Sequence, residues 1–170
     1  MIILPPLIIT LKLDDESFEF FNELRQLHFP PERNFLSAHL TLFHHLPGED
    51  SKTVASDLTH FCAGFKNFPL QFNDWRMLGR GVAVKVEAPE LYSLHRLLSK
   101  SWNEWLTAQD RQKFQPHITV QNKVAPDQAR RLYENLVAGW QPRMGAATGL
   151  RLWHYLGGEW KSEKDFLFAV

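Results

Sequence analysis

Apolar and polar residues follow two periods along this chain. Stretches of strict alternation, typical of strands, are separated by stretches in which apolar residues recur every three or four positions, typical of helices. In the first part of the sequence, the pattern predicts a strand at 7–13, a helix ending before Pro30, a strand at 39–46, a helix at 51–63 and a strand at 68–78. Asp14 or Asp15 can cap the first helix and Ser51 the second.

The same order of elements begins again after Gly79 and Gly81. The pattern now predicts a strand at 81–88, a helix from Pro89, a strand at 116–120, a helix from Pro126, and strands at 150–156 and 166–170 around the turn Gly157-Gly158. The order β-α-β-α-β therefore occurs twice. We expect an α+β fold in a single domain over 1–170, with duplicated halves at about 1–79 and 80–170.

Composition narrows the class of protein. With 170 residues, 44% of them hydrophobic, the chain can bury one sizeable core, and 19 basic residues balance 19 acidic ones, so no global field attracts nucleic acid or membranes. The lone Cys62 excludes an internal disulfide framework and is expected to be a buried apolar residue in a reducing cytosol. The apolar residues 1–9 lack the basic region of a signal peptide, and no stretch approaches the roughly 20 apolar residues of a membrane span. We expect a cytoplasmic monomer without membrane contact.

Two of the expected strands carry one shared pattern. Residues 39–42 read HLTL and residues 117–120 read HITV, 78 positions apart. Because side chains alternate across a strand, each histidine shares a face with the threonine two positions later, while the apolar residues point to the core. Each strand thus offers an imidazole beside a hydroxyl, at matching places in the two halves.

This pairing suits the chemistry of a phosphodiester. Its cleavage needs a base for the attacking oxygen and an acid for the leaving oxygen, and imidazole, with a pKa of about 6.5, serves either purpose. A threonine hydroxyl can donate to a non-bridging phosphate oxygen and stabilise the charge of the transition state. The pattern predicts that His39 and His117 face each other across a cleft, each beside its threonine.

The paired motifs resemble those of the 2H phosphoesterase superfamily, and within it the 2′-5′ RNA ligase and RNA 2′,3′-cyclic phosphodiesterase group. Pro116 before the second motif and FHHLPGE after the first extend the resemblance. It implies that His39 and His117 are the catalytic pair and that Thr41 and Thr119 bind phosphate. The fold it implies has two pseudo-symmetric sheet lobes, flanked by helices, around a central cleft.

The resemblance also implies a function. The protein would be a metal-independent phosphoesterase, without cofactor, that hydrolyses 2′,3′-cyclic phosphates on RNA or nucleotide ends and can run the reverse 2′-5′ ligation. Gln121-Asn122-Lys123 stands where many members have an arginine, which leaves Lys123 as the nearby cation. Two alternatives stay open: a binding module of the same fold with little turnover, and a cyclic phosphodiesterase of small nucleotides.

Further residues are assigned by alternation along regular strands. Phe43 and His45 should lie on the same cleft face as His39, and Gln121 should lie on the same face as His117. Three residues are therefore candidate substrate contacts: Phe43, Gln121 and Lys123. His44 should face away and be structural, which argues against a zinc site built from His39, His44 and His45.

Aromatic and histidine residues elsewhere receive simpler interpretations. Trp153 and Tyr155 share a face of a late strand, and this face is expected either to pack in the core or at the surface, or to border the cleft. His154 takes the opposite face of that strand. Three further histidines, His28, His60 and His95, are expected at the surface or at element boundaries.

Overall fold

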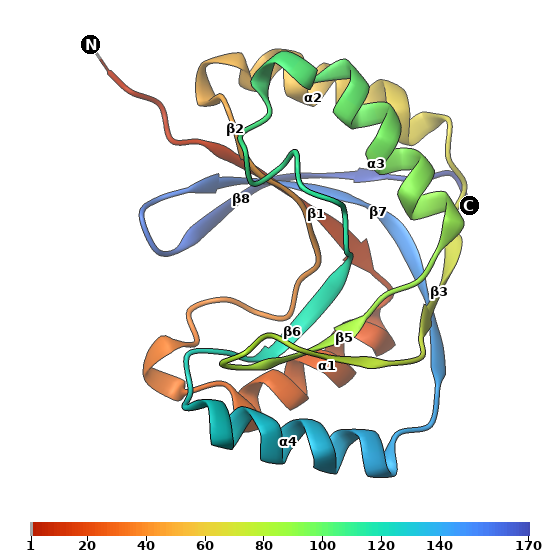
Figure 1. Ribbon diagram of the computed structural model, residues 1–170. Helices are drawn as coiled ribbons and strands as arrows, with labels where there is room; N and C mark the ends of the chain where they lie inside the picture. Colours follow the sequence, from red (N-terminus) through yellow and green to blue (C-terminus); the bar gives the residue numbers. More distant parts are fainter. Residues whose placement is uncertain (1) are drawn as a thin grey trace.

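Two antiparallel sheets face each other, and each is covered by two helices on its outer side (Figure 1). The computed structural model describes residues 2–170. The larger sheet has the order β2-β1-β7-β3, with β8 paired to β7. Its strands are β1 (Leu7–Leu13), β2 (Thr41–Leu46), β3 (Phe68–Phe72), β7 (Arg143–Tyr155) and β8 (Trp160–Leu167). The smaller sheet, in the order β4-β5-β6, contains β4 (Trp75–Met77), β5 (Val82–Lys85) and β6 (His117–Gln121).

Helices α2 and α3 cover the larger sheet, and α1 and α4 cover the smaller one (Figure 1). Their bounds are α1 (Asp15–His28), α2 (Ser51–Ala63), α3 (Pro89–Ser101) and α4 (Pro126–Gly139). The carboxylate of Asp14 caps α1 by accepting from the Ser17 N–H at 3.1 Å, and Pro89 and Pro126 occupy the first turns of α3 and α4. Ser51 does not cap α2, because the helix begins at Ser51 itself, directly after a short 3₁₀ turn.

The predicted duplication agrees with the order of the elements. The chain runs β1-α1-β2-α2-β3 and then, after β4, β5-α3-β6-α4-β7-β8. The two halves exchange helices, because α1 follows β1 of the larger sheet but packs against β6 of the smaller one. The α+β class and the two-lobed architecture are therefore confirmed, with each lobe built from both halves.

Several strand boundaries differ from the prediction. Strand β2 begins at Thr41 rather than 39, so His39 precedes it, and β5 spans Val82–Lys85 rather than 81–88. The single strand expected at 68–78 breaks at Asn73 and Asp74, where the chain crosses from the larger sheet to the smaller one. Strand β7 begins at Arg143 rather than 150, because Gly145 and Gly149 hide it from the sequence pattern. A Cβ at Gly145 would lie 2.1 Å from the Ser17 hydroxyl, and one at Gly149 would lie 2.4 Å from a carbonyl of β8, so close packing requires glycine at both. Strand β8 correspondingly spans 160–167 instead of 166–170.

The core fills the space between each sheet and its helices. Among its largest buried side chains are Phe21, Phe72 and Trp102, and β1 is buried along most of its length at the centre of the larger sheet. Cys62 is buried as expected, and burial raises the pKa of its thiol to about 12. Over residues 2–170, no helix is long and apolar enough to cross a membrane.

Candidate active site

The two motif histidines have the same local geometry. Nδ1 of His39 lies 2.7 Å from the carbonyl oxygen of Ser37, and Nδ1 of His117 lies 2.7 Å from that of Gln115. A carbonyl can only accept, so each Nδ1 carries the hydrogen and each Nε2 is left as the nitrogen available to a substrate. The fold thus presents two imidazoles in one tautomer and in equivalent settings 78 residues apart.

A central pocket of about 170 Å³ joins the two motifs. It is lined by His39, Thr41, His44, His117, Thr119 and Trp160. The structure therefore brings together both histidines and both threonines singled out by the sequence. Trp160, at the start of β8, was not anticipated, and its ring centroid lies 4.8 Å from that of His39.

Each motif strand contains a β-bulge just after its threonine. In β2, Thr41 pairs with Thr10 but Phe43 pairs with Ile9; in β6, Thr119 pairs with Ala83 but Gln121 pairs with Val82. Two residues on the motif strand thus oppose one step of the neighbouring strand. Such an extra residue reverses the alternation beyond it.

The bulges correct two of the expected substrate contacts. Phe43 is 0% exposed and its ring stacks on that of His95, and Gln121 is 3% exposed. Both side chains point into the core rather than into the cleft, because the alternation assumed for regular strands ends at the bulge. Lys123 is exposed with a φ of 63° and does not line the pockets around the motifs, so the cations of the site come from elsewhere.

His44 is the residue most displaced from its expected position. The bulge turns it into the central pocket, where it lies with His39 and His117. The carboxylate of Asp110 accepts from the His44 N–H at 2.9 Å, the His45 N–H at 3.1 Å and Nδ1 of His44 at 2.9 Å. His44 is therefore a fixed part of the cleft, and the prediction that it faces away is wrong.

The environment of the two motif histidines favours their neutral forms. Burial, helped by the charges of Arg25 and of the neighbouring histidines, lowers the pKa of His39 to about 4, although the Ser37 carbonyl opposes the shift. Burial and the charge of Arg76 lower the pKa of His117, against the pull of the Gln115 carbonyl. At neutral pH the free protein therefore holds two uncharged imidazoles at this site.

Two arginines beside the motifs were missed by the sequence analysis. Arg25 of α1 is buried, and its guanidinium donates to the Thr119 carbonyl at 3.1 Å and to the Asn34 side chain at 2.8 Å. Burial lowers its pKa to about 10, which leaves it charged at neutral pH. Arg76 of β4 lines a pocket together with His117. Both lie far along the chain from the motif that they approach, and no local pattern could have linked them.

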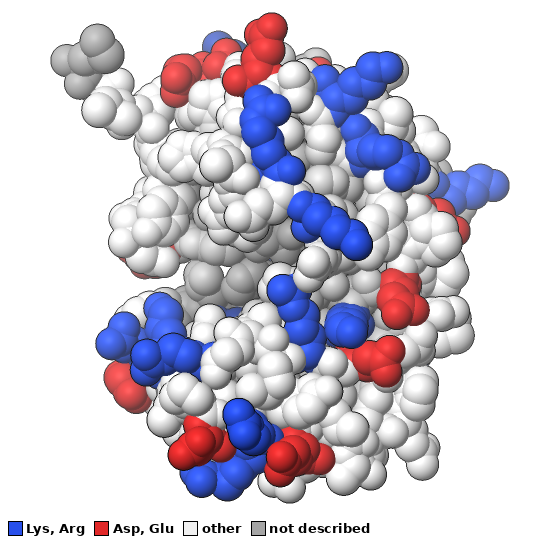
Figure 2. All heavy atoms as spheres, viewed as in Figure 1, with Lys and Arg blue, Asp and Glu red and all other residues white. Residues whose placement is uncertain are grey.

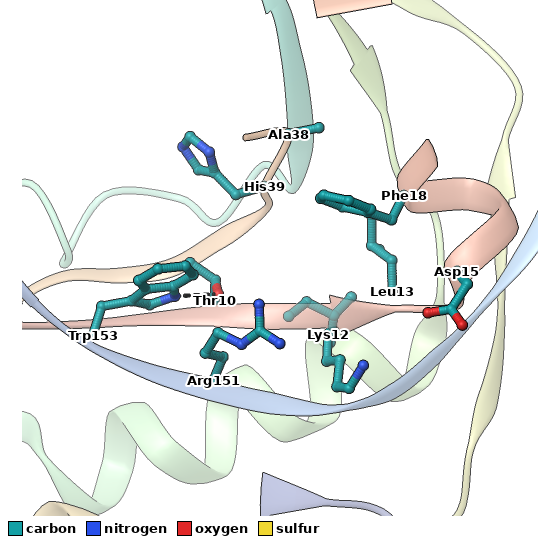
Figure 3. Close-up of a pocket in the computed structure, with 10 residues that line it drawn as sticks. Thr10, Lys12, Leu13, Asp15, Phe18, Ala38, His39, Arg151 and Trp153 are labelled. Carbon is teal, nitrogen blue, oxygen red and sulfur yellow. Dashed lines mark hydrogen bonds between the residues drawn. The ribbon is translucent and has the colours of Figure 1, made fainter. Parts of the chain in front are cut away.

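An aromatic pocket of about 280 Å³ lies on the other side of His39. Its lining includes Phe18, Phe35, Arg151, Trp153 and Trp160. Figure 3 shows the adjoining part, where Arg151 and Trp153 extend from β7 below His39 and the Trp153 indole donates to the Thr10 hydroxyl at 2.8 Å. Of the positions that the sequence leaves open for Trp153, in the core, at the surface or at the cleft, the structure shows the last, because Trp153 lines a pocket together with His39. Arg151 is held by a two-pronged pair with Asp165, at 2.5 and 3.0 Å.

A metal site of several ligands is not formed by the described part of the chain. No three His, Cys, Asp or Glu side chains of residues 2–170 are grouped so that they could hold a metal ion. His45 is exposed and takes part in the cluster around Asp110 only through its backbone N–H.

The sequence matches the family profile of the 2′-5′ RNA ligase superfamily over residues 13–159, and the chain belongs to this superfamily. The resemblance to 2H phosphoesterases is thereby confirmed. A comparison with curated protein sequences finds no match.

Solved structures of the same architecture cover nearly the whole chain. TT0787 of Thermus thermophilus has a TM-score of 0.69 at 17% identity, over 96% of this chain and 97% of its own. Escherichia coli LigT in its apo form has a TM-score of 0.67 at 20% identity, over 99% of this chain and 100% of its own. LigT complexed with 3′-AMP has a TM-score of 0.65 at 19% identity, over 98% of this chain and 99% of its own. These likenesses establish a shared fold.

Proposed function

We propose that the protein is a metal-independent phosphoesterase that hydrolyses 2′,3′-cyclic phosphates at RNA or nucleotide ends, with His39 and His117 as its acid–base pair. The observation that carries the proposal is the single pocket lined by both histidines and both threonines, with each imidazole held in the same tautomer by a backbone carbonyl. Two equivalent imidazoles on either side of one group suit a reaction that needs a base and an acid at once.

In the proposed reaction, Nε2 of one histidine takes a proton from water, and the water oxygen bonds to phosphorus. The bond from phosphorus to one ribose oxygen breaks, and the protonated Nε2 of the other histidine gives its proton to that oxygen. The hydroxyls of Thr41 and Thr119 donate to the non-bridging oxygens as their charge grows. Run backwards, with a nucleoside hydroxyl in place of water, the same steps join two ends.

The aromatic pocket beside His39 supports a nucleoside as the rest of the substrate. Trp153 and Trp160 offer faces on which a base can stack, and Arg151 supplies donors at the pocket wall. LigT, which shares the fold, has been crystallised with 3′-AMP, with ATP and with NADP+, and we extend nucleotide binding from that protein to this one.

The test is an activity screen over adenosine 2′,3′-cyclic phosphate, RNA ending in a cyclic phosphate and 2′-5′-linked oligonucleotides. We expect hydrolysis of the cyclic phosphates that survives EDTA. His39→Ala and His117→Ala should each remove most of the turnover, and the double variant should be little worse than the poorer single one, because both groups act on one transition state. His60→Ala, on the exposed face of α2, is the matched control.

Binding of these substrates without turnover would favour the alternative of a binding module. Loss of activity in EDTA with recovery on adding zinc would point to metal chemistry instead. Hydrolysis of the cyclic mononucleotide but not of RNA would favour a small-nucleotide phosphodiesterase.

A further inference from the structure

A second, larger pocket adjoins the central one. Its volume is about 380 Å³, within the usual size range of ligand sites. It shares Thr41, His44 and His117 with the central pocket. From there it extends to Arg76 of β4 and to Lys113. Three glutamines of the loop between α3 and β6 complete its polar lining: Gln109, Gln112 and Gln115. A group seated there would be adjacent to the reacting phosphate.

His44 stands at the junction of the two pockets in a fixed orientation. Burial tends to raise the pKa of Asp110, but hydrogen bonds from the His44 ring and from two backbone N–H groups outweigh it and lower that pKa, so this carboxylate is ionised at neutral pH. An ionised carboxylate can only accept, and Nδ1 of His44 therefore carries the donated hydrogen. Nε2 is left as the ring nitrogen that is available to a group in the pocket. Asp110 thus holds a third imidazole, that of His44, in place beside the motif histidines His39 and His117.

The charges around this pocket do not balance. Within residues 2–170, neither Arg76 nor Lys113 forms an ion pair with a carboxylate. Asp110 is the sole acidic residue among the described residues of the lining, and its side chain is 1% exposed and already engaged by His44. Figure 2 shows the hollow between the lobes with Lys and Arg side chains on the lower lobe beside it. Because the total charge of the chain is zero, this excess of positive charge is local and does not reflect the charge of the protein as a whole.

We propose that His44, Arg76 and Lys113 form a second phosphate subsite, which binds a phosphate on the 5′ side of the nucleoside whose cyclic phosphate reacts. The assignment rests on the proposed function, because it takes the reacting phosphate to lie between His39 and His117. Two positively charged side chains and one imidazole line one polar pocket, and phosphate oxygens are the acceptors that arginine and lysine bind most strongly. The subsite selects substrates with two phosphates, such as an oligonucleotide end, over a cyclic mononucleoside phosphate.

The first test measures binding, which does not depend on turnover. Titration calorimetry compares adenosine 3′,5′-bisphosphate with 3′-AMP. We expect the bisphosphate to bind at least about tenfold more tightly, as charge-assisted hydrogen bonds to one phosphate provide. Arg76→Gln and Lys113→Gln, singly and combined, should reduce this ratio to about twofold or less, whereas the matched control Arg131→Gln, on the exposed face of α4, should keep it. Equal binding of the two ligands by the wild-type protein would overturn the subsite, as would an unchanged ratio in the combined variant.

The second test asks whether the subsite serves the reaction. Adenosine 2′,3′-cyclic phosphate, its 5′-phosphorylated form and the dinucleotide ApA 2′,3′-cyclic phosphate are compared by kcat/KM. We expect a preference of about tenfold for the last two substrates over the first, and loss of the preference in Arg76→Gln/Lys113→Gln. The larger of the two preferences tells whether the subsite favours a terminal phosphate or a phosphodiester. His44→Gln, which keeps an amide donor toward Asp110, should lose part of the preference.

The outcomes separate this inference from the proposed function. Turnover of all three substrates at equal kcat/KM overturns the subsite and leaves the proposed function standing. No turnover of any substrate, combined with a bisphosphate preference that depends on Arg76 and Lys113, overturns the proposed function and supports the subsite. Melting temperatures close to that of the wild-type protein show that the variants are folded.

Discussion

His39 and His117 each share one hydrogen with a backbone carbonyl and are both uncharged in the free protein near neutral pH, with consequences for the pH profile. Catalysis in the proposed mechanism needs one ring neutral and one protonated. Burial lowers the pKa of both histidines from 6.5, and that of His39 falls to about 4. The state with one neutral and one protonated ring is therefore most populated at acid pH. We expect kcat/KM, which reports the free enzyme, to peak below pH 6.5 and to fall as the pH rises through 7 and 8. The two limbs belong to the coupled pair. A maximum at or above pH 7.5, in rates measured between pH 4.5 and 9 on protein that stays folded, contradicts the pKa directions.

Phe43 offers a direct test of the bulge. As a fully buried side chain it should be needed for stability, so Phe43→Ala should lower the free energy of unfolding by about 3–5 kcal/mol in urea denaturation. The matched control is Phe35→Ala in the aromatic pocket, where the side chain is 67% exposed and the loss should be below about 1 kcal/mol. If Phe43→Ala instead raised KM and left stability unchanged, Phe43 would be a substrate contact after all.

At the scale of elements, α3 is attached to β2 through a stack of three rings. His95 lies between Phe43 and Phe114, with interplanar angles of 6° and 3°, and burial lowers its pKa to about 4 against a hydrogen bond with Leu42. Between pH 6.5 and 4 the unfolded chain therefore binds more protons at this residue than the folded one, and the folded protein loses stability as the pH falls. The expectation that His95 is a surface or boundary residue is wrong.

Replacement of His95 by phenylalanine tests this linkage. His95→Phe keeps three stacked rings but removes the titrating group. Between pH 7.5 and pH 5 the free energy of unfolding of the wild-type protein should therefore fall by about 1–2 kcal/mol more than that of the variant. At pH 7.5 the variant should be equal or slightly less stable, since the hydrogen bond with Leu42 is lost. Parallel losses in the two proteins would mean that His95 is already protonated in the fold.

The motif strands show what sequence can and cannot reveal at this scale. The four motif residues were found because their signal is local: a histidine and a threonine on one face of a strand, repeated 78 residues later. The bulges leave no such trace, since Leu42 and Phe43 read as an ordinary strand and nothing marks the extra residue. Alternation along a regular strand therefore predicts the wrong face for three side chains: Phe43, His44 and Gln121.

Long-range partners were equally invisible. Asp110 lies 66 residues from His44, and Arg25 lies 94 residues from Thr119. Only the packing of the loop 106–116 and of α1 brings them to the cleft, and a single sequence carries no record of that packing. The helix and strand order, by contrast, follows from periodicity and from Asp14, Pro89 and Pro126 at helix starts.

At the scale of the whole molecule, the halves of the repeat are not the lobes. Strand β1 depends on β7 of the second half for one of its two partners, and α1 packs against β6. We expect fragments 1–79 and 80–170, produced separately, to show little tertiary structure, and an equimolar mixture to regain the near-ultraviolet circular dichroism of the intact chain. A stable, cooperatively melting 1–79 fragment would show that the repeat folds as a unit.

The residues around the two motifs differ between the halves, and this difference makes the cleft directional. The place of His44 in the first half is taken by Asn122 in the second. The pocket beside His39 is lined by the indoles of Trp153 and Trp160, whereas the described lining beside His117 includes Arg76, Lys113 and three glutamines. A nucleotide whose base stacks on the indoles can therefore bind in one orientation. That orientation determines which ribose oxygen faces the proton donor. Hydrolysis should then give a single regioisomer, either the 2′- or the 3′-phosphomonoester, visible as one product resonance by phosphorus NMR. A mixture of both isomers would mean that the cleft reads its substrate in either direction.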